Sequence, residues 1–319
     1  MAVRKWTTDD MPDLHGYRVV VTGANSGLGL ETTRALAAKG AHVIMASRNL
    51  DSARKAEATV KSSVPSASLE VRQLDLASLA SIRAFASDLL GGREKLNLLF
   101  NNAGVMAIPR RETQDGFEMQ FGTNYLGHFA LTGLLLPLLL ATPKSRVITT
   151  TSGARLLGKI QMDDLNRTKS YSRWEAYGQS KLANLLFSDE LQRRLAAVGA
   201  NTISVAAHPG YANTNLQSTS VQASGSAFER IGMGFGALVA QSGYMGTLPQ
   251  LYAATSPNIQ GGELVGPGDL GNMRGYPKID TNARKEYDRP LAARLWDASV
   301  ALTDVDFASL NELQQSAAD

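Results

Sequence analysis

Short apolar runs alternate with longer amphipathic runs along the first two hundred residues of the chain. The short runs are rich in β-branched residues and predict buried strands, whereas the longer ones have helical spacing. The predicted strands are Tyr17–Thr22, Ala41–Ala46, Ser68–Gln73, Leu96–Asn101, Ser145–Thr151 and Asn201–Ala206. The predicted helices are Gly29–Lys39, Asp51–Lys61, Ser78–Leu90, one or two within Phe117–Leu140, and Tyr177–Val198.

The predicted strands are apolar on both faces. Such strands belong to a parallel sheet that helices cover on both sides. Because crossover connections are right-handed, the pattern predicts a doubly wound, Rossmann-type α/β fold. A helix over 243–255 and a short run near 263–265 are expected to complete the sheet. We expect a single domain over residues 1–319, with a core of about 15–280 and a C-terminal extension over 281–319, since we find neither linker nor repeat.

Composition narrows the range of partners. The 319 residues include 32 Lys and Arg against 29 Asp and Glu, an excess too small to indicate a nucleic-acid partner. The lack of cysteine excludes disulfides and thiolate chemistry, and the four histidines lack metal-ligand spacing, so no metal site is predicted. The N-terminus does not resemble a secretory signal. The most apolar stretch, Ala130–Ala141, is too short to span a bilayer, so we expect a buried helix, no membrane span and a cytoplasmic location.

A glycine-rich turn follows the first predicted strand. Its sequence, TGANSGLG, places three glycines before the first helix, with G-x-x-x-G-x-G spacing rather than the usual G-x-G-x-x-G. Bare backbone N–H groups at a helix N-terminus bind phosphate, and glycines let the chain approach it closely. A merely flexible turn is the alternative. We predict that this turn binds a dinucleotide through Gly23, Asn25, Ser26, Gly27, Leu28 and Gly29.

The end of the second strand indicates which dinucleotide binds. An acidic residue there would hold the 2′-hydroxyl of NAD, whereas an arginine accommodates the 2′-phosphate of NADP. The chain has Ser47 and Arg48 at this place, and both can donate hydrogen bonds. NADP(H) is therefore the predicted cofactor. The alternative is that Arg48 is a solvated surface residue.

Two further strand ends offer cofactor contacts. Asp75 and Leu76 follow the third strand, and Asp75 either accepts a hydrogen bond from the adenine amino group or caps the next helix. Asn102, Ala103 and Gly104 follow the fourth strand, at the ligand-binding edge of the sheet. We expect Asn102 to brace the strands, and Ala103 and Gly104 to leave room for a ribose.

Candidate chemistry lies in four polar residues. Tyr177 and Lys181 share one helix face, and an ammonium there would lower the pKa of the phenol and make it a proton donor or acceptor. Chance helical spacing is the alternative. Ser152 follows the fifth strand, where it either binds a substrate carbonyl or serves as a cap or turn serine. Asn124 is a poor helix former in a helical segment, so it either kinks the helix and binds a water next to Lys181 or faces solvent.

In this order and spacing, these motifs resemble the short-chain dehydrogenase/reductase family. The strings Asn124–Phe129, Tyr177–Phe187 and His208–Gly210 resemble its retinol dehydrogenase-like branch. The resemblance implies a catalytic tetrad in which Tyr177 protonates a carbonyl oxygen while hydride leaves the nicotinamide, together with Asn124, Ser152 and Lys181. It implies that Lys181 binds the nicotinamide ribose. It also implies that the nicotinamide is clasped by Pro209, Gly210 and Thr214.

The predicted function is an NADP(H)-dependent oxidoreductase that interconverts a carbonyl and an alcohol. Residues 216–244 carry apolar side chains among glycines and predict a lid over a lipophilic substrate, although a packed helix or a subunit contact is equally consistent. The alternatives are a C=C reductase, a sugar-nucleotide epimerase, or a non-catalytic NADP-binding redox sensor. Family membership implies a homodimer or homotetramer, with Ala130–Ala141 as one candidate contact.

Overall fold

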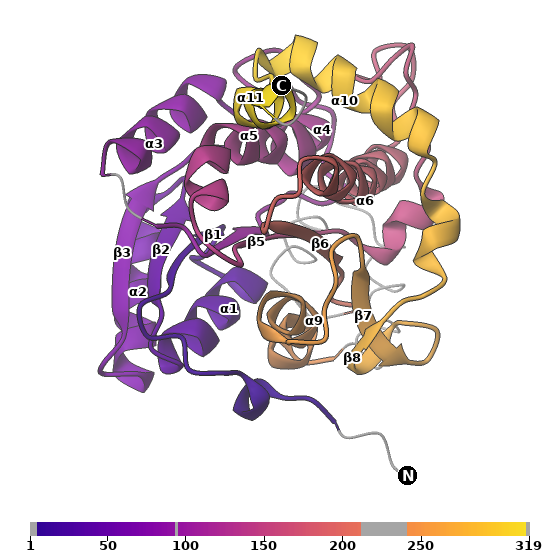
Figure 1. The fold of residues 1–319 in the computed structure, drawn as a ribbon. Helices are drawn as coiled ribbons and strands as arrows, with labels where there is room; N and C mark the ends of the chain where they lie inside the picture. Colours follow the sequence, from indigo (N-terminus) through magenta and orange to yellow (C-terminus); the bar gives the residue numbers. More distant parts are fainter. Residues whose placement is uncertain (1–4, 93–94, 212–240, 317–319) are drawn as a thin grey trace.

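The computed structural model describes residues 5–92, 95–211 and 241–316. In this part of the chain, an eight-stranded sheet has the order β3-β2-β1-β4-β5-β6-β7-β8 (Figure 1). The strands are β1 Arg18–Thr22, β2 His42–Ser47, β3 Ser68–Gln73, β4 Leu98–Asn101, β5 Arg146–Thr150, β6 Ile203–Ala207, β7 Leu264–Asp269 and β8 Arg274–Ile279. All neighbours pair in parallel except β7 and β8, which are antiparallel. The strand order reverses between β1 and β4, which defines a topological switch point at their carboxyl ends.

Helices cover both faces of this sheet (Figure 1). They are α1 Gly27–Ala38, α2 Leu50–Ser63, α3 Leu79–Gly91, α4 Met119–Phe121, α5 Gly127–Leu140, α6 Arg173–Ala197, α9 Gly243–Thr255, α10 Arg289–Thr303 and α11 Ala308–Ser316. One layer contains α1, α2 and α9, while α3, α5 and α6 form the other, each with its own apolar cluster against the sheet. The predicted doubly wound Rossmann-type fold is confirmed. The sequence pattern did not predict β8 or α11.

The segment between β4 and β5 has an irregular helix. A π-helical turn, Gly122–Leu126, joins α4 to α5 and contains Asn124. Single π-helical turns within α-helices often occur at functional sites, because the extra residue turns side chains in a new direction. The helix distortion expected at Asn124 therefore takes the form of a π turn.

The apolar helix α5 is buried within the fold. Phe129 lies 5.1 Å from Trp296 of α10 and 4.9 Å from Phe307, which precedes α11, as measured between ring centroids. Among the described residues, the helical run Met119–Leu140 is long and apolar enough to cross a membrane, but 72% of its most apolar window is buried. A core helix meets the same criteria, since a helix that is apolar all round must be covered. The helix suggested as a subunit contact is thus covered by its own chain.

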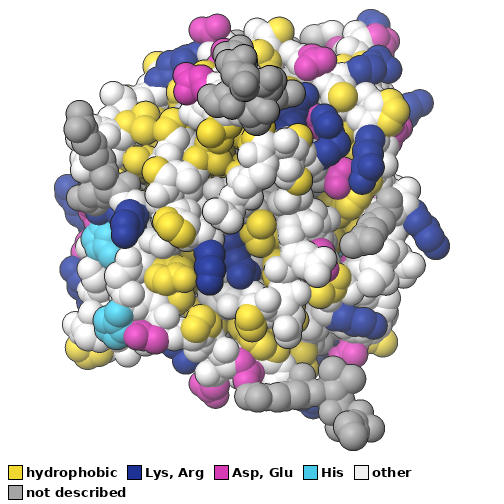
Figure 2. Space-filling model, viewed as in Figure 1, with side chains coloured by type: hydrophobic (Ala, Val, Ile, Leu, Met, Phe, Trp, Pro, Cys, Tyr) yellow, Lys and Arg dark blue, Asp and Glu magenta, His cyan; other side chains and the backbone are white. Residues whose placement is uncertain are grey.

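Charges on the visible surface are mixed. On the face shown in Figure 2, basic and acidic side chains are interspersed with apolar and uncharged polar ones. A cleft lies at the carboxyl edge of the strands.

Candidate active site

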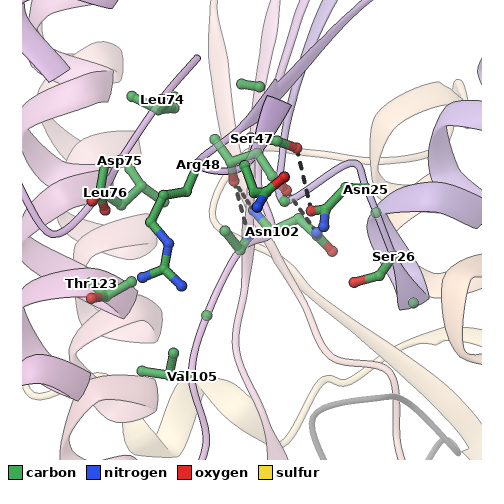
Figure 3. A pocket seen from close by; sticks show the side chains of 18 of the residues that line it. Asn25, Ser26, Ser47, Arg48, Leu74, Asp75, Leu76, Asn102, Val105 and Thr123 are labelled. Carbon is green, nitrogen blue, oxygen red and sulfur yellow. Dashed lines mark hydrogen bonds between the residues drawn. The ribbon is translucent and has the colours of Figure 1, made fainter. Parts of the chain in front are cut away.

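A cleft of about 290 Å³ opens at the switch point (Figure 3). Its wall includes the predicted cofactor residues Gly23, Asn25, Ser26, Gly27, Leu28, Gly29, Ser47, Arg48, Asp75, Leu76, Asn102, Ala103 and Gly104. It also includes Thr22, Leu74, Val105 and Thr123, which the motifs did not single out. Among the described residues, no group of three or more histidines and carboxylates could hold a metal ion.

The glycine turn packs tightly against the end of β4. A Cβ on Gly29 would overlap the carbonyl oxygen of Gly23 and come within 2.7 Å of the side-chain nitrogen of Asn102. Gly23 itself has φ +67°, in the left-handed region that favours glycine. Asn102 Nδ2 donates to the Thr22 carbonyl at 2.8 Å, which is the bracing contact expected of it. The turn thus leaves backbone N–H groups at the start of α1 open to the cleft, as a dinucleotide phosphate requires.

The end of β2 contributes a polar cluster and a cation. Ser47 Oγ donates to Asn25 Oδ1 at 3.3 Å, and Asn25 Nδ2 donates to Ser52 Oγ at 3.1 Å. Arg48 is exposed at the end of the strand, and its side chain extends into the cleft on the side of Leu76 and Thr123 (Figure 3). A cation and hydroxyl groups therefore lie together where a dinucleotide's ribose would reach β2.

Asp75 does not cap α3. Ser78 is the N-cap of that helix and accepts a hydrogen bond from Ser81 N. The Asp75 carboxylate instead accepts from Ala77 N at 2.9 Å and lines the cleft. The capping alternative was wrong because the helix begins later than a cap at Asp75 would require.

The Ser152 hydroxyl lies close enough to the Tyr177 phenol to influence its pKa. Burial raises the pKa of Tyr177 to about 12, although the Ser152 hydrogen bond lowers it in part. Ser152 Oγ also accepts from Ala154 N at 3.2 Å and caps the 3₁₀ helix Gly153–Leu157, so the capping role given as the alternative for this serine is present. Its contact with a substrate carbonyl stays a prediction. The serine and tyrosine hydroxyls therefore face each other from two different elements.

Lys181 lies near this pair but does not activate the phenol as expected. Its Nζ is 5.8 Å from the centre of the Tyr177 ring and donates to the Thr150 carbonyl at 3.0 Å. Burial lowers the pKa of Lys181 to about 8. The expected lowering of the Tyr177 pKa by this ammonium was wrong, because desolvation of the phenol outweighs the other influences on it.

Asn124 lies between the candidate catalytic residues and the cleft. Its Oδ1 accepts from Val105 N at 2.8 Å, and its Nδ2 donates to the Val105 carbonyl and to Ser180 Oγ, both at 2.9 Å. The side chain is fully buried, so the solvent-facing alternative was wrong. A Cβ on Gly104 would lie 3.0 Å from Asn124 Oδ1 and 3.6 Å from Lys181 Nζ. The cleft and the candidate catalytic group therefore meet at Gly104.

His128 is a buried residue that links Asn124 to Thr22, and the sequence motifs did not single it out. Its Nδ1 lies 2.9 Å from the Asn124 carbonyl, and its Nε2 lies 2.9 Å from Thr22 Oγ1. Burial lowers the pKa of His128 to about 4, so the ring is neutral at pH 7. Because the carbonyl can only accept, Nδ1 carries the proton and Nε2 accepts from the Thr22 hydroxyl. A histidine within a strongly apolar helix was the available signal for this role.

The residues after β6 lie apart from the wall of the cleft. The Pro209 carbonyl accepts from Gln241 Nε2 at 2.7 Å. Gly210 has φ +65°, and a Cβ there would overlap the carbonyl oxygen of Met273, in the connection from β7 to β8. Thr214 and residues 216–240 of the predicted lid lie outside the described residues. The last lid residues belong to the start of α9.

The fold and cleft define a nucleotide-binding α/β protein, and comparison with known proteins gives its family. Residues 17–225 match the family model described as "short chain dehydrogenase". The human protein named retinol dehydrogenase 13 is 40% identical over 299 residues, which cover 93% of this chain and 87% of that protein. The chain belongs to the short-chain dehydrogenase family, in a branch similar to the retinol dehydrogenases.

Other relatives extend over similar lengths. The short-chain dehydrogenase TIC 32 B, chloroplastic, of Brassica napus is 36% identical over 306 residues, covering 92% of this chain and 90% of that protein. A crystal structure of an uncharacterized protein from Mycobacterium paratuberculosis has a TM-score of 0.79 at 42% identity, covering 95% of this chain and 99% of that one. The family consists of oxidoreductases that bind a nicotinamide cofactor and act on alcohol or carbonyl groups, and this chain is such an enzyme.

Proposed function

We propose that this enzyme uses NADP(H) to interconvert a carbonyl and an alcohol on a lipophilic small molecule. The observation that carries the proposal is the proximity of Ser152 to the buried Tyr177, beside a cleft that runs from the glycine turn to Gly104. The retinol dehydrogenase relatives are named for a lipophilic alcohol, which supports this substrate class. A cytoplasmic location and a homo-oligomeric state stay predictions.

The residues of the cleft suit a dinucleotide phosphate. The glycine turn and the N-terminus of α1 bind the pyrophosphate through backbone N–H groups. Arg48 and Ser47 bind the 2′-phosphate, and Lys181 binds the nicotinamide ribose with its ammonium group. When bound, the nicotinamide supplies or accepts the hydride at the carbonyl carbon.

The proton moves at Tyr177. A phenol with a pKa of about 12 keeps its proton at neutral pH and donates it to a substrate oxygen that becomes basic as it gains negative charge. Ser152 donates to the same oxygen and holds it beside the phenol. Because oxidation requires Tyr177 to lose its proton first, its rate rises with pH, whereas reduction is favoured at neutral pH.

Replacing Tyr177 by Phe tests the chemistry. The change removes the proton donor and keeps the ring, so kcat for carbonyl reduction should fall by about 10²–10⁴-fold. The affinity for NADPH, measured by isothermal titration, should stay within about twofold. Tyr252→Phe, on α9 at the opposite face of the sheet, is the matched control. Undiminished turnover in Tyr177→Phe would exclude the proposed proton donor, and a cellular role that survives the loss of turnover would favour the redox-sensor alternative.

Replacing Arg48 by Asp tests the cofactor. A charged hydrogen bond contributes about 1.5–3 kcal/mol, so the preference for NADPH over NADH should fall by about 10–100-fold. Arg54→Asp on α2 makes the same charge change outside the wall of the cleft, and its preference should stay within about threefold of the unmodified enzyme. The ratio of kcat/KM for the two cofactors is the measurement. If both variants kept the original ratio, Arg48 would not bind the 2′-phosphate.

A further inference from the structure

A continuous chain of buried hydrogen bonds runs from the wall of the cleft to the helix that carries Tyr177. Thr22 lines the cleft, and its hydroxyl oxygen lies 2.9 Å from His128 Nε2. The other ring nitrogen, Nδ1, donates to the Asn124 carbonyl at 2.9 Å. Asn124 Nδ2 donates to Ser180 Oγ at 2.9 Å, and Ser180 Oγ donates to the Tyr177 carbonyl at 2.8 Å. His128 therefore lies in the middle of a path between the cleft and the candidate catalytic residues.

At the cleft, His128 contacts a hydroxyl that joins the ends of β1 and β4. The Thr22 oxygen accepts from the backbone N–H groups of Asn102 and Ala103, both at 2.9 Å, and both residues line the cleft. The hydroxyl proton has two acceptors within reach, His128 Nε2 at 2.9 Å and the Phe100 carbonyl at 3.1 Å. The ring therefore contacts the point at which the two strands that border the switch point are joined.

On its other side, His128 contacts the π turn. Gly127 N donates to the Gly122 carbonyl five residues earlier, a spacing that distinguishes this turn from a regular α-helix. The Asn124 carbonyl lies within the turn and accepts from the His128 ring. The Asn124 side chain accepts from Val105 N, on the wall of the cleft. A shift of the turn would therefore move the Asn124 amide relative to the cleft.

The state of the His128 ring suits a fixed link. The side chain is only 1% exposed, and burial lowers its pKa to about 4, with a smaller contribution from the charge of Lys181. The ring is therefore neutral at pH 7, with one donor and one acceptor, and both have partners. Buried polar networks whose members are all paired make the structure rigid. The ring thus keeps the same two contacts across the physiological pH range.

We propose that His128 is a positioning residue, which holds Asn124 and the helix of Tyr177 in a set place relative to the ends of β1 and β4. His128 itself lies outside the wall of the cleft, so it acts through Thr22 and Asn124 rather than on a bound molecule. Reaction rates depend strongly on such placement, since a displacement of about 1 Å can cost about 10²-fold. This inference rests on the proposed carbonyl–alcohol function and adds a residue to the support of its site.

Two substitutions separate the hydrogen bonds of His128 from the space that its ring fills. His128→Leu removes both hydrogen bonds, whereas His128→Gln supplies one donor and one acceptor. With NADPH and benzaldehyde as probes, His128→Leu should lower kcat about 10–100-fold, and His128→Gln should return it to within about fivefold of the unmodified enzyme. KM for benzaldehyde and the Kd of NADPH should stay within about threefold, because the ring touches neither molecule. If His128→Leu does not fold, His128→Asn replaces it, since the shorter amide donates to the Asn124 carbonyl without reaching Thr22.

His42→Leu is the matched control. His42 also makes two side-chain hydrogen bonds, with Ser68 at 2.8 Å and Glu70 at 3.3 Å, but it lies at the amino end of β2, away from the cleft. Its kcat should stay within about twofold of the unmodified enzyme. An undiminished kcat in His128→Leu, even with a loss of stability, would mean that the histidine only supports the fold and would overturn the positioning role. A loss of kcat that His128→Gln does not reduce would overturn it as well.

Amide hydrogen exchange without cofactor, followed by NMR, separates failure of this inference from failure of the proposed function. Val105 N donates to Asn124 Oδ1 at 2.8 Å, so the Val105 amide should exchange about fivefold faster in His128→Leu, where Asn124 is less well held. The Asn97 amide, which donates to the Arg18 carbonyl just before β4, should not change. This result supports the positioning role even if no aldehyde is reduced, in which case only the proposed function fails. Equal exchange of Val105 in both chains overturns the inference, whether or not the enzyme turns over.

Discussion

Replacing Lys181 by Met should make the enzyme inactive and more stable. Lys181 is only 4% exposed, and its ammonium donates to a single described carbonyl, that of Thr150, at 3.0 Å. That carbonyl also accepts from Asn184 Nδ2 at 3.0 Å, so it keeps a partner when the lysine is removed. Methionine has similar length and no charge to desolvate. We therefore expect the Lys181 side chain to serve cofactor binding rather than stability.

The magnitude follows from the pKa of Lys181, which burial lowers from 10.5 to about 8. Below pH 8 the lysine is charged in both the folded and the unfolded chain, so the fold carries the full cost of burying it. Between the two pKa values the unfolded chain binds more protons, and the free energy of unfolding rises with pH. The difference between the pKa values corresponds to about 3 kcal/mol, and the lost hydrogen bond offsets about 1 kcal/mol. Lys181→Met should therefore gain about 2 kcal/mol at neutral pH.

Urea unfolding at several pH values measures this difference. The gain of Lys181→Met over the unmodified enzyme should have its full value at pH 7 and should become a loss of about 1 kcal/mol above the pKa of a free lysine, where only the lost hydrogen bond remains. Lys169→Met is the matched control, since Lys169 is 68% exposed, and its stability should change by less than about 0.5 kcal/mol. A variant that is less stable at pH 7, or a gain that does not depend on pH, would refute the reasoning.

Two further changes test the cleft and the C-terminal segment. Gly29→Ala places a methyl group against the carbonyl oxygen of Gly23, so NADPH affinity by isothermal titration should fall at least about 10-fold. Gly91→Ala, whose added Cβ meets no atom within 4 Å, should bind normally, and equal affinities would contradict the glycine turn's role. Glu286→Gln leaves Arg155 buried beside a neutral partner and should cost about 1–3 kcal/mol in urea unfolding. Unchanged stability would mean that this ion pair contributes nothing.

Most of the fold could be predicted from the sequence because its strands and helices have clear periodicity. The central parallel strands are apolar on both faces, and the predicted limits differ little from the observed ones from β1 to β6. The strand β8, Arg274–Ile279, escaped prediction because its sequence RGYPKI is polar and contains a proline. Its strand conformation depends on pairing with β7, which periodicity does not reveal. The nine residues of α11 are too few for a reliable helical pattern.

The positions of the candidate site residues followed from motifs, but their environment did not. Spacing places Tyr177 and Lys181 on one helix face, yet it says nothing about burial. Burial raises the pKa of Tyr177, whereas the spacing alone predicted that Lys181 would lower it. His128 contacts Thr22, which lies 106 positions earlier in the sequence, and Asn124, which lies four positions earlier.

Deuterium transfer tests the central claim most directly. NADPH carrying deuterium at the transferable C4 position would be incubated with the enzyme and benzaldehyde, and the product examined by mass spectrometry and NMR. The product should be benzyl alcohol with one deuterium on the carbinol carbon, and Tyr177→Phe should show no label transfer above background. Cinnamaldehyde extends the test to the C=C reductase alternative. Deuterium on an alkene-derived carbon, or alcohol formed without deuterium, would contradict the assignment of this chain as a carbonyl–alcohol oxidoreductase.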